Sequence, residues 1–101
     1  MVQNLKTNEF DTAIQTNLAV VDFYADWCGP CRMLAPVLDA MSTENPDVKF
    51  LAVNVEANPA LAQRFDIQSI PCLVFIKNGI EFTRQAGFTT KPSNGLTKKY
   101  N

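Results

Sequence analysis

The sequence contains no histidine and only three cysteines, so most of the usual ligands of a structural zinc site are missing. Cys28 and Cys31 stand three positions apart, and Cys72 lies far from them along the chain. One chain therefore cannot supply four thiolates, or two thiolates and two imidazoles. Three thiolates with a carboxylate, or a site shared between two chains, remain open, but we expect no bound metal.

The sequence also lacks an excess of charge and a long apolar run. Nine basic residues stand against ten acidic ones, and they form no basic patch of the kind that nucleic acid binding requires. No apolar run is long enough to span a bilayer. The start, MVQNLKTNEF, has no basic segment followed by an apolar one, as an export signal would. We therefore expect no nucleic acid or membrane partner and, by default, a reducing cytoplasmic location.

What is present is the composition of an ordinary globular protein, with 47% apolar and 19% charged residues. A chain of 101 residues is long enough for one hydrophobic core, and no linker or repeat divides it. We expect residues 1–101 to form a single domain. The odd number of cysteines fits poorly with a structural disulfide framework.

The spacing of apolar residues predicts alternating helices and strands. Helices are expected over residues 4–16, 28–44 and 59–65, with a weaker helical pattern in 89–101. Strands are expected over residues 18–24, 48–55, 72–77 and 80–86. Asn78-Gly79 indicates a hairpin between the last two strands, and Pro36 predicts a kink in the second helix. This order predicts an α/β fold with a mixed central β-sheet flanked by helices on both faces.

The stretch ADWCGPCRM places Cys28 and Cys31 where an expected strand gives way to an expected helix. Unpaired N–H groups and the helix dipole favour an anion at a helix N-terminus, which lowers the pKa of a thiol there. Cys31 lies on the same side of the first turn and can close a disulfide with Cys28. Pro30 stiffens this turn where its missing N–H costs little. The pattern favours thiol–disulfide exchange over a metal site or two inert core thiols.

Longer segments around this pair resemble a known family. VVDFYA at residues 20–25, WCGPC at 27–31, Met33 and Ala35-Pro36 resemble the active-site region of thioredoxins, and Ile70-Pro71 with KNG at 77–79 resembles their second signature. The resemblance extends to about Gly87 and implies a thioredoxin fold. It also implies a protein disulfide reductase that needs no bound cofactor, acts on oxidised client proteins and receives electrons from a thioredoxin reductase. A monomer is our default expectation.

The resemblance assigns roles to the residues of the pair and its surroundings. Cys28 would be the attacking thiolate and Cys31 the resolving thiol, while Gly29 and Pro30 between them would tune the stability of the thiolate. Pro71 would be cis and lie against the pair.

Three further residues would line an apolar groove for an extended client segment, which would pair with the backbone in the manner of an added strand. They are Trp27, Ile70 and Gly87.

Asp22 is a lone carboxylate in an apolar strand, and we expect it to be buried. A desolvated carboxyl has a raised pKa, and the resemblance makes Asp22 the proton acceptor for Cys31. Thioredoxins often place a lysine on the next strand, where this sequence has Ala52. Without an ammonium partner, we expect a more strongly raised pKa. An exposed Asp22 at a strand edge is the alternative.

Cys72 departs from the family pattern, in which threonine usually follows the proline. It either fills the same small volume or acts as a third thiol near Cys28. Two rival functions also remain open: an oxidant or isomerase, and a docking module that uses the fold as a binding surface.

Overall fold

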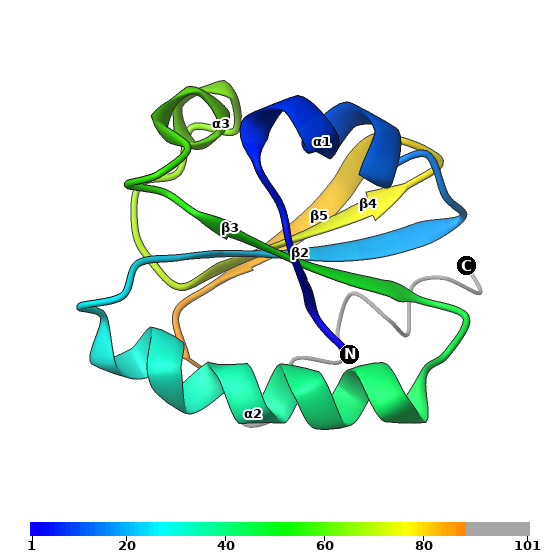
Figure 1. Cartoon of the computed structure of the whole chain (residues 1–101), viewed down its shortest axis with the longest axis horizontal. Coiled ribbons are helices and arrows are strands. Elements are labelled where there is room, and N and C mark those ends of the chain that lie inside the picture. The colour runs from blue at the N-terminus through cyan, green and yellow to red at the C-terminus, as the bar shows by residue number, and fades with distance from the viewer. Residues whose placement is uncertain (89–101) are drawn as a thin grey trace.

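The computed structural model describes residues 1–88, which form a five-stranded sheet with helices on both faces (Figure 1). The elements in chain order are β1 (Gln3–Asn4), α1 (Thr7–Ala13), β2 (Leu18–Tyr24), α2 (Gly29–Glu44), β3 (Lys49–Asn54), α3 (Pro59–Arg64), β4 (Cys72–Lys77) and β5 (Ile80–Ala86). The strand order across the sheet is β1-β3-β2-β4-β5. β3 is parallel to β1 and β2, whereas β4 is antiparallel to β2 and β5. The mixed sheet expected from the sequence is confirmed.

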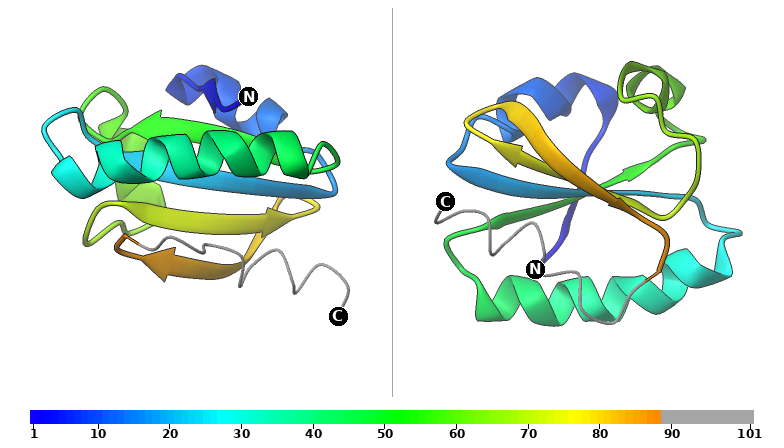
Figure 2. Two further views of the ribbon diagram at one scale, coloured as in Figure 1. Left: turned by 90° about the horizontal axis from the view of Figure 1, so that it is seen from below. Right: turned by 180° about the vertical axis from the view of Figure 1, so that it is seen from behind.

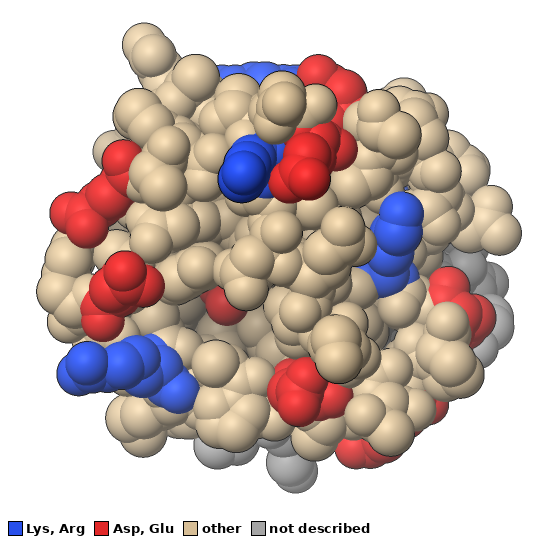
Figure 3. All heavy atoms as spheres, viewed as in Figure 1, with Lys and Arg blue, Asp and Glu red and all other residues tan. Residues whose placement is uncertain are grey.

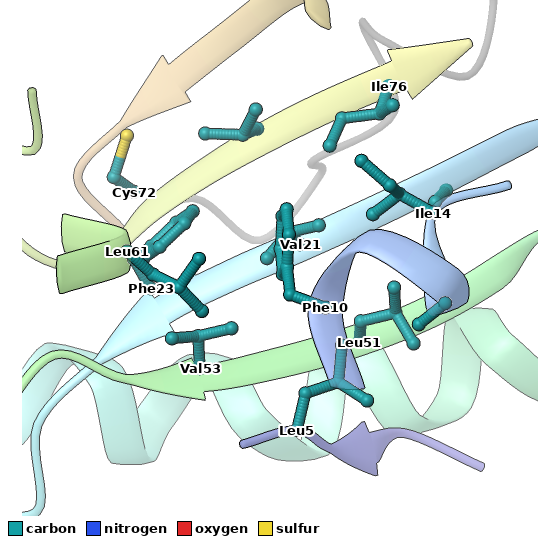
Figure 4. Close-up of a cluster of buried hydrophobic side chains, with 13 residues drawn as sticks. Leu5, Phe10, Ile14, Val21, Phe23, Leu51, Val53, Leu61, Cys72 and Ile76 are labelled. Carbon is teal, nitrogen blue, oxygen red and sulfur yellow. The ribbon is translucent and has the colours of Figure 1, made fainter. Parts of the chain in front are cut away.

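The two faces of the sheet are covered by different helices, as the three views together show (Figures 1 and 2). On one face, Phe10 of α1 and Leu61 of α3 pack against Phe23 of β2, in a cluster that also holds Cys72 (Figure 4). On the other face, Leu34 and Leu38 of α2 belong to a second cluster of buried hydrophobic residues. Because β2 is covered on both faces, its apolar residues need no alternation with polar ones.

The expected N-terminal helix over residues 4–16 is wrong at both ends, since α1 spans only Thr7–Ala13. Gln3 and Asn4 form the edge strand β1, and the N–H of Leu5 continues this pairing by donating to the carbonyl of Ala52 at 2.9 Å. Helix α1 begins only at Thr7, whose N–H donates to Asn58 Oδ1 at 2.9 Å. The chain therefore starts with a strand, because pairing with β3 outweighs the weak helical spacing.

The other elements agree closely with expectation. β2, β4 and β5 have the expected bounds, and α2, β3 and α3 differ by one residue at one or both ends. Pro36 lies inside α2, whose first turns are inclined to the rest of the helix in Figure 1. Asn78 and Gly79 both have positive φ, at 53° and 84°, as a tight hairpin requires. The weaker helical pattern over residues 89–101 lies outside the described residues.

None of the helices within residues 1–88 combines the length and the apolar character needed to cross a bilayer.

Candidate active site

Cys28 occupies the N-cap of α2, directly after the loop that follows β2. Its Sγ accepts a hydrogen bond from the N–H of Cys31 at 3.2 Å, so sulfur takes the place of the usual capping oxygen. The two cysteines form a disulfide with Cα atoms 5.2 Å apart. In the reduced protein, the same N–H and the helix dipole would favour the thiolate form of Cys28. The location expected for the pair is confirmed.

The two residues between the cysteines shape the first turn of α2. Pro30 lies where a helix has no internal partner for its N–H, so the proline ring breaks no hydrogen bond. A Cβ on Gly29 would meet no heavy atom within 4 Å, so the packing leaves open space at this position. Because glycine has no side chain, nothing projects from this position beside the disulfide.

Ile70 approaches the pair from the loop before β4, and Pro71 follows it in that loop. The Ile70–Pro71 peptide bond is cis, as expected, and Ile70 packs against the cluster that contains Cys28 and Cys31. The carbonyl of Pro71 accepts a hydrogen bond from the N–H of Gly87 at 2.8 Å. Gly87 has φ 86°, which favours glycine, so this bond fixes the end of β5 beside the proline.

Trp27 precedes the pair and is 66% exposed, as expected for a residue at the rim of a site. Its Nε1 donates to Glu56 Oε2 at 3.0 Å, which fixes the orientation of the indole. Glu56 could not be recognised from the sequence, because a lone acidic residue after a strand carries no signal of its own. Glu56 is held in turn by Asn54, whose Oδ1 accepts from the Glu56 N–H at 2.9 Å.

Asp22 lies in the middle of β2 and is 4% exposed, so the expected burial is confirmed. Its neighbours across the sheet are Ala52 on β3 and Leu73 on β4, neither of which can pair with a charge. Asp22 Oδ1 has no hydrogen-bond partner among the described residues. Desolvation by burial raises the pKa of this carboxyl from 3.8 to about 7.

A hollow of about 660 Å³ opens between α2 and the β1 edge of the sheet, and both Asp22 and Cys31 line it. Figure 3 views this face of the molecule and shows the hollow with acidic atoms at its floor. Tyr24 stands at the hollow, where its hydroxyl donates to Asn4 Oδ1 at 2.7 Å. The buried acid and the second cysteine thus line one partly open space.

Among residues 1–88, no group of three or more cysteines or carboxylates is arranged to hold a metal ion.

Comparison with known proteins agrees with this geometry. Residues 1–99 match the thioredoxin family profile. The chain belongs to the thioredoxin family. Thioredoxin of Chlamydia muridarum is 43% identical over 93 residues, covering 92% of this chain and 91% of that protein. Thioredoxin-1 of Saccharomyces cerevisiae is 43% identical over 89 residues, or 86% of each chain. A solved structure of Plasmodium falciparum thioredoxin has a TM-score of 0.89 at 30% identity, covering 98% of this chain and 99% of that one.

Family, fold and the close cysteine pair together define the chemistry. The chain is a thiol–disulfide oxidoreductase. Its similarity to thioredoxins in sequence and structure identifies it more closely as a disulfide reductase. Thioredoxins act on protein substrates and are reduced in turn by thioredoxin reductase.

Cys72 is the cysteine that stays outside the disulfide. It is 3% exposed and packs in the cluster beneath α1 and α3, together with Phe23 and Leu61. Burial raises the pKa of the Cys72 thiol, which keeps it protonated and unreactive. This environment favours the packing role over the third working thiol.

Asp22→Asn is expected to stabilise the protein at pH 8 but not at pH 3. The Asp22 carboxyl ionises near 3.8 in the unfolded chain but only at about 7 in the folded one, so stability falls as the pH rises through this window. Three pKa units correspond to about 4 kcal/mol, so the free energy of unfolding at pH 8 should rise by up to that amount.

Urea denaturation of both proteins at the two pH values checks this expectation. Glu44→Gln, at the exposed C-terminal end of α2, is the control and should change the free energy of unfolding by no more than about 0.5 kcal/mol. An equal effect of Asp22→Asn at pH 3 and pH 8 would contradict the raised pKa.

Cys72→Thr is expected to leave the reduction midpoint of the Cys28–Cys31 pair unchanged, because the Cys72 thiol is buried and protonated. The midpoint is measured by equilibration in glutathione buffers, alkylation and mass spectrometry, and should be strongly reducing in both proteins. A shifted midpoint, or a peroxide-induced disulfide that the variant no longer forms, would show that the third thiol takes part.

Proposed function

We propose that Cys28 carries out the first step of disulfide reduction in client proteins. The Cys28 thiolate attacks one sulfur of a client disulfide, forms a mixed disulfide and releases the other client sulfur as a thiolate. The observation that carries this assignment is the N-cap position of Cys28, whose Sγ accepts the Cys31 N–H at 3.2 Å. A helix N-terminus supplies the positive potential that a nucleophilic thiolate needs.

Cys31 then resolves the mixed disulfide. Its sulfur loses a proton and attacks Cys28 Sγ, which releases the second client thiolate and leaves Cys28 and Cys31 joined. The client gains two electrons and two protons over the cycle, and the pair loses them. A thioredoxin reductase returns the electrons to the pair, and Gly29 and Pro30 tune how strongly the pair gives them up.

Asp22 is the acceptor for the Cys31 proton. A carboxyl with a pKa of about 7 is poised to take a proton from a thiol near neutral pH. Asp22 and Cys31 line the same hollow, which gives the proton a shared space through which it can pass from the thiol to the carboxyl.

Clients are held beside the pair by an apolar surface. Ile70 lies against the disulfide cluster, Gly87 is bonded to Pro71, and the exposed indole of Trp27 is oriented by Glu56. An extended client segment would hydrogen-bond to the backbone at Ile70, while the indole covers its side chains. Pro71 lacks an N–H and so leaves the approach to the sulfurs free of a competing donor.

The same proposal includes the setting in which the reaction takes place. We place the protein in the cytoplasm as a monomeric single domain of residues 1–101, acting on oxidised protein clients without nucleic acid or membrane. The support is the net charge of −1, which offers no excess of basic residues to nucleic acid or to an anionic membrane surface, and a reducing cysteine pair, which suits a reducing compartment.

Cys31→Ser is expected to trap clients, whereas Cys28→Ser is not. Without the resolving thiol the mixed disulfide on Cys28 persists, and without the nucleophile it never forms. Both variants are made in the Cys72→Thr background, reduced, and mixed with insulin. Peptide mapping without reductant should find insulin bound to Cys28 in the Cys31→Ser protein alone. Equal capture by both variants would contradict the order of attack.

Asp22→Asn is expected to slow the resolving step by roughly 100-fold at pH 7, within the range for a general base. Cys28 is bonded to the client at this stage, so a rise of the rate with pH near 7 reports Asp22 in the wild type. Rapid acid quench and alkylation during a single turnover separate this step from the first attack. An unchanged rate and pH profile in the variant would exclude Asp22 as the acceptor.

A further inference from the structure

The hollow over Asp22 has the features of a binding site in its own right. It is open to solvent in the space-filling view, and its floor holds a carboxyl that is 4% exposed and whose Oδ1 has no partner among the described residues (Figure 3). Ala52 stands directly opposite Asp22 on β3, on the same face of the sheet. Its single methyl group leaves the space beside the carboxyl empty, because no longer side chain projects there.

The charged groups around the hollow favour a cation. Asp22 and Asp26 approach from the β2 side, and α2 contributes Arg32 and Asp39. Tyr24 also lines the hollow, but its hydroxyl is already bonded to Asn4. Three carboxylates therefore face one guanidinium, and the potential of the hollow is negative whenever Asp22 is ionised. An anion would be repelled from this space.

The walls favour an organic cation over a metal ion. They are built mainly by the apolar residues Val2, Ala25, Ala35, Pro36, Leu38 and Ala52. Among residues 1–88, no three acidic or cysteine side chains converge closely enough to coordinate a metal. A short alkyl chain would replace water along these walls and gain free energy with each buried methylene, while its charged end meets the carboxyl.

We propose that the hollow binds a small primary alkylammonium ion, with its ammonium group against the Asp22 carboxylate and its alkyl chain along the apolar wall formed by α2 and Ala52. The ammonium donates hydrogen bonds to a buried acceptor that has none, which compensates part of the cost of burying the charge. Binding requires the ionised acid, so the ligand and a proton compete for Asp22. This inference does not rest on a catalytic role for Asp22, because it applies equally to the oxidised protein.

The test uses the oxidised protein, in which Cys28 and Cys31 do not titrate. The pKa of Asp22 is measured by carbon NMR of its carboxyl group, in n-butylammonium chloride and in sodium chloride at equal ionic strength. An opposite charge in contact lowers the pKa of a carboxyl by roughly one unit or more, so n-butylammonium should lower it at least that far below its value in sodium. A shift of one unit means that the ionised form binds about tenfold more tightly than the neutral form.

Variants of the hollow separate binding from general screening. Ala52→Met fills the space without adding charge and should abolish the response, whereas Arg32→Gln removes the one positive charge at the rim and should tighten binding several-fold. Amide shifts of Ala35 and Ala52 should saturate with n-butylammonium in the wild type and not in Asp22→Asn. Equal pKa values in the two salts, or saturable shifts that persist in Asp22→Asn, would overturn the proposal. Because Arg32→Gln alters an exposed side chain, this variant tests the proposal even where Ala52→Met does not fold.

Discussion

The burial of one carboxyl in the central strand is the constraint on which the site depends. β2 pairs with β3 and β4 along its length and has helices over both faces, so Asp22 is only 4% exposed even though it lines the hollow. The protein tolerates an acid there because the carboxyl holds its proton up to a pH of about 7. The strand that imposes this burial also leads directly into the loop and helix that carry Cys28 and Cys31. Stability and reactivity therefore depend on the same element.

Most of the fold could be predicted from the sequence because local and long-range preferences agree in it. The strand over 18–24 is continuously apolar apart from Asp22, and the Asn78-Gly79 turn fixes the register of the hairpin that follows. The N-terminal strand could not be predicted in this way. Gln3 and Asn4 have no apolar pattern of their own, and they become a strand only because β3 offers an unpaired edge. Such pairing is a property of the assembled sheet.

The candidate active site likewise has features that the sequence predicts and features that it does not. The cysteine pair is evident from its spacing and its place between strand and helix, and the lone charge at Asp22 is evident from its apolar surroundings. The cis bond before Pro71 followed only from the family resemblance, since nothing in a single X–Pro sequence distinguishes the isomers. The Trp27–Glu56 bond and the hollow join segments far apart in the chain, so no local pattern could indicate them.

The hollow follows from two features that each look minor. Strand β1 brings Asn4 beside Tyr24, which builds one wall, and alanine at position 52 leaves the space in front of Asp22 unfilled. A longer cationic side chain at that position would pair with the acid and hold its pKa down. With alanine, nothing in the described chain offsets the desolvation of Asp22. The charge state of Asp22 then depends on the pH and on cations that enter the hollow from solvent. With alanine at position 52, the protonation of Asp22 is therefore set by the surrounding solution and not by a neighbouring side chain of the protein.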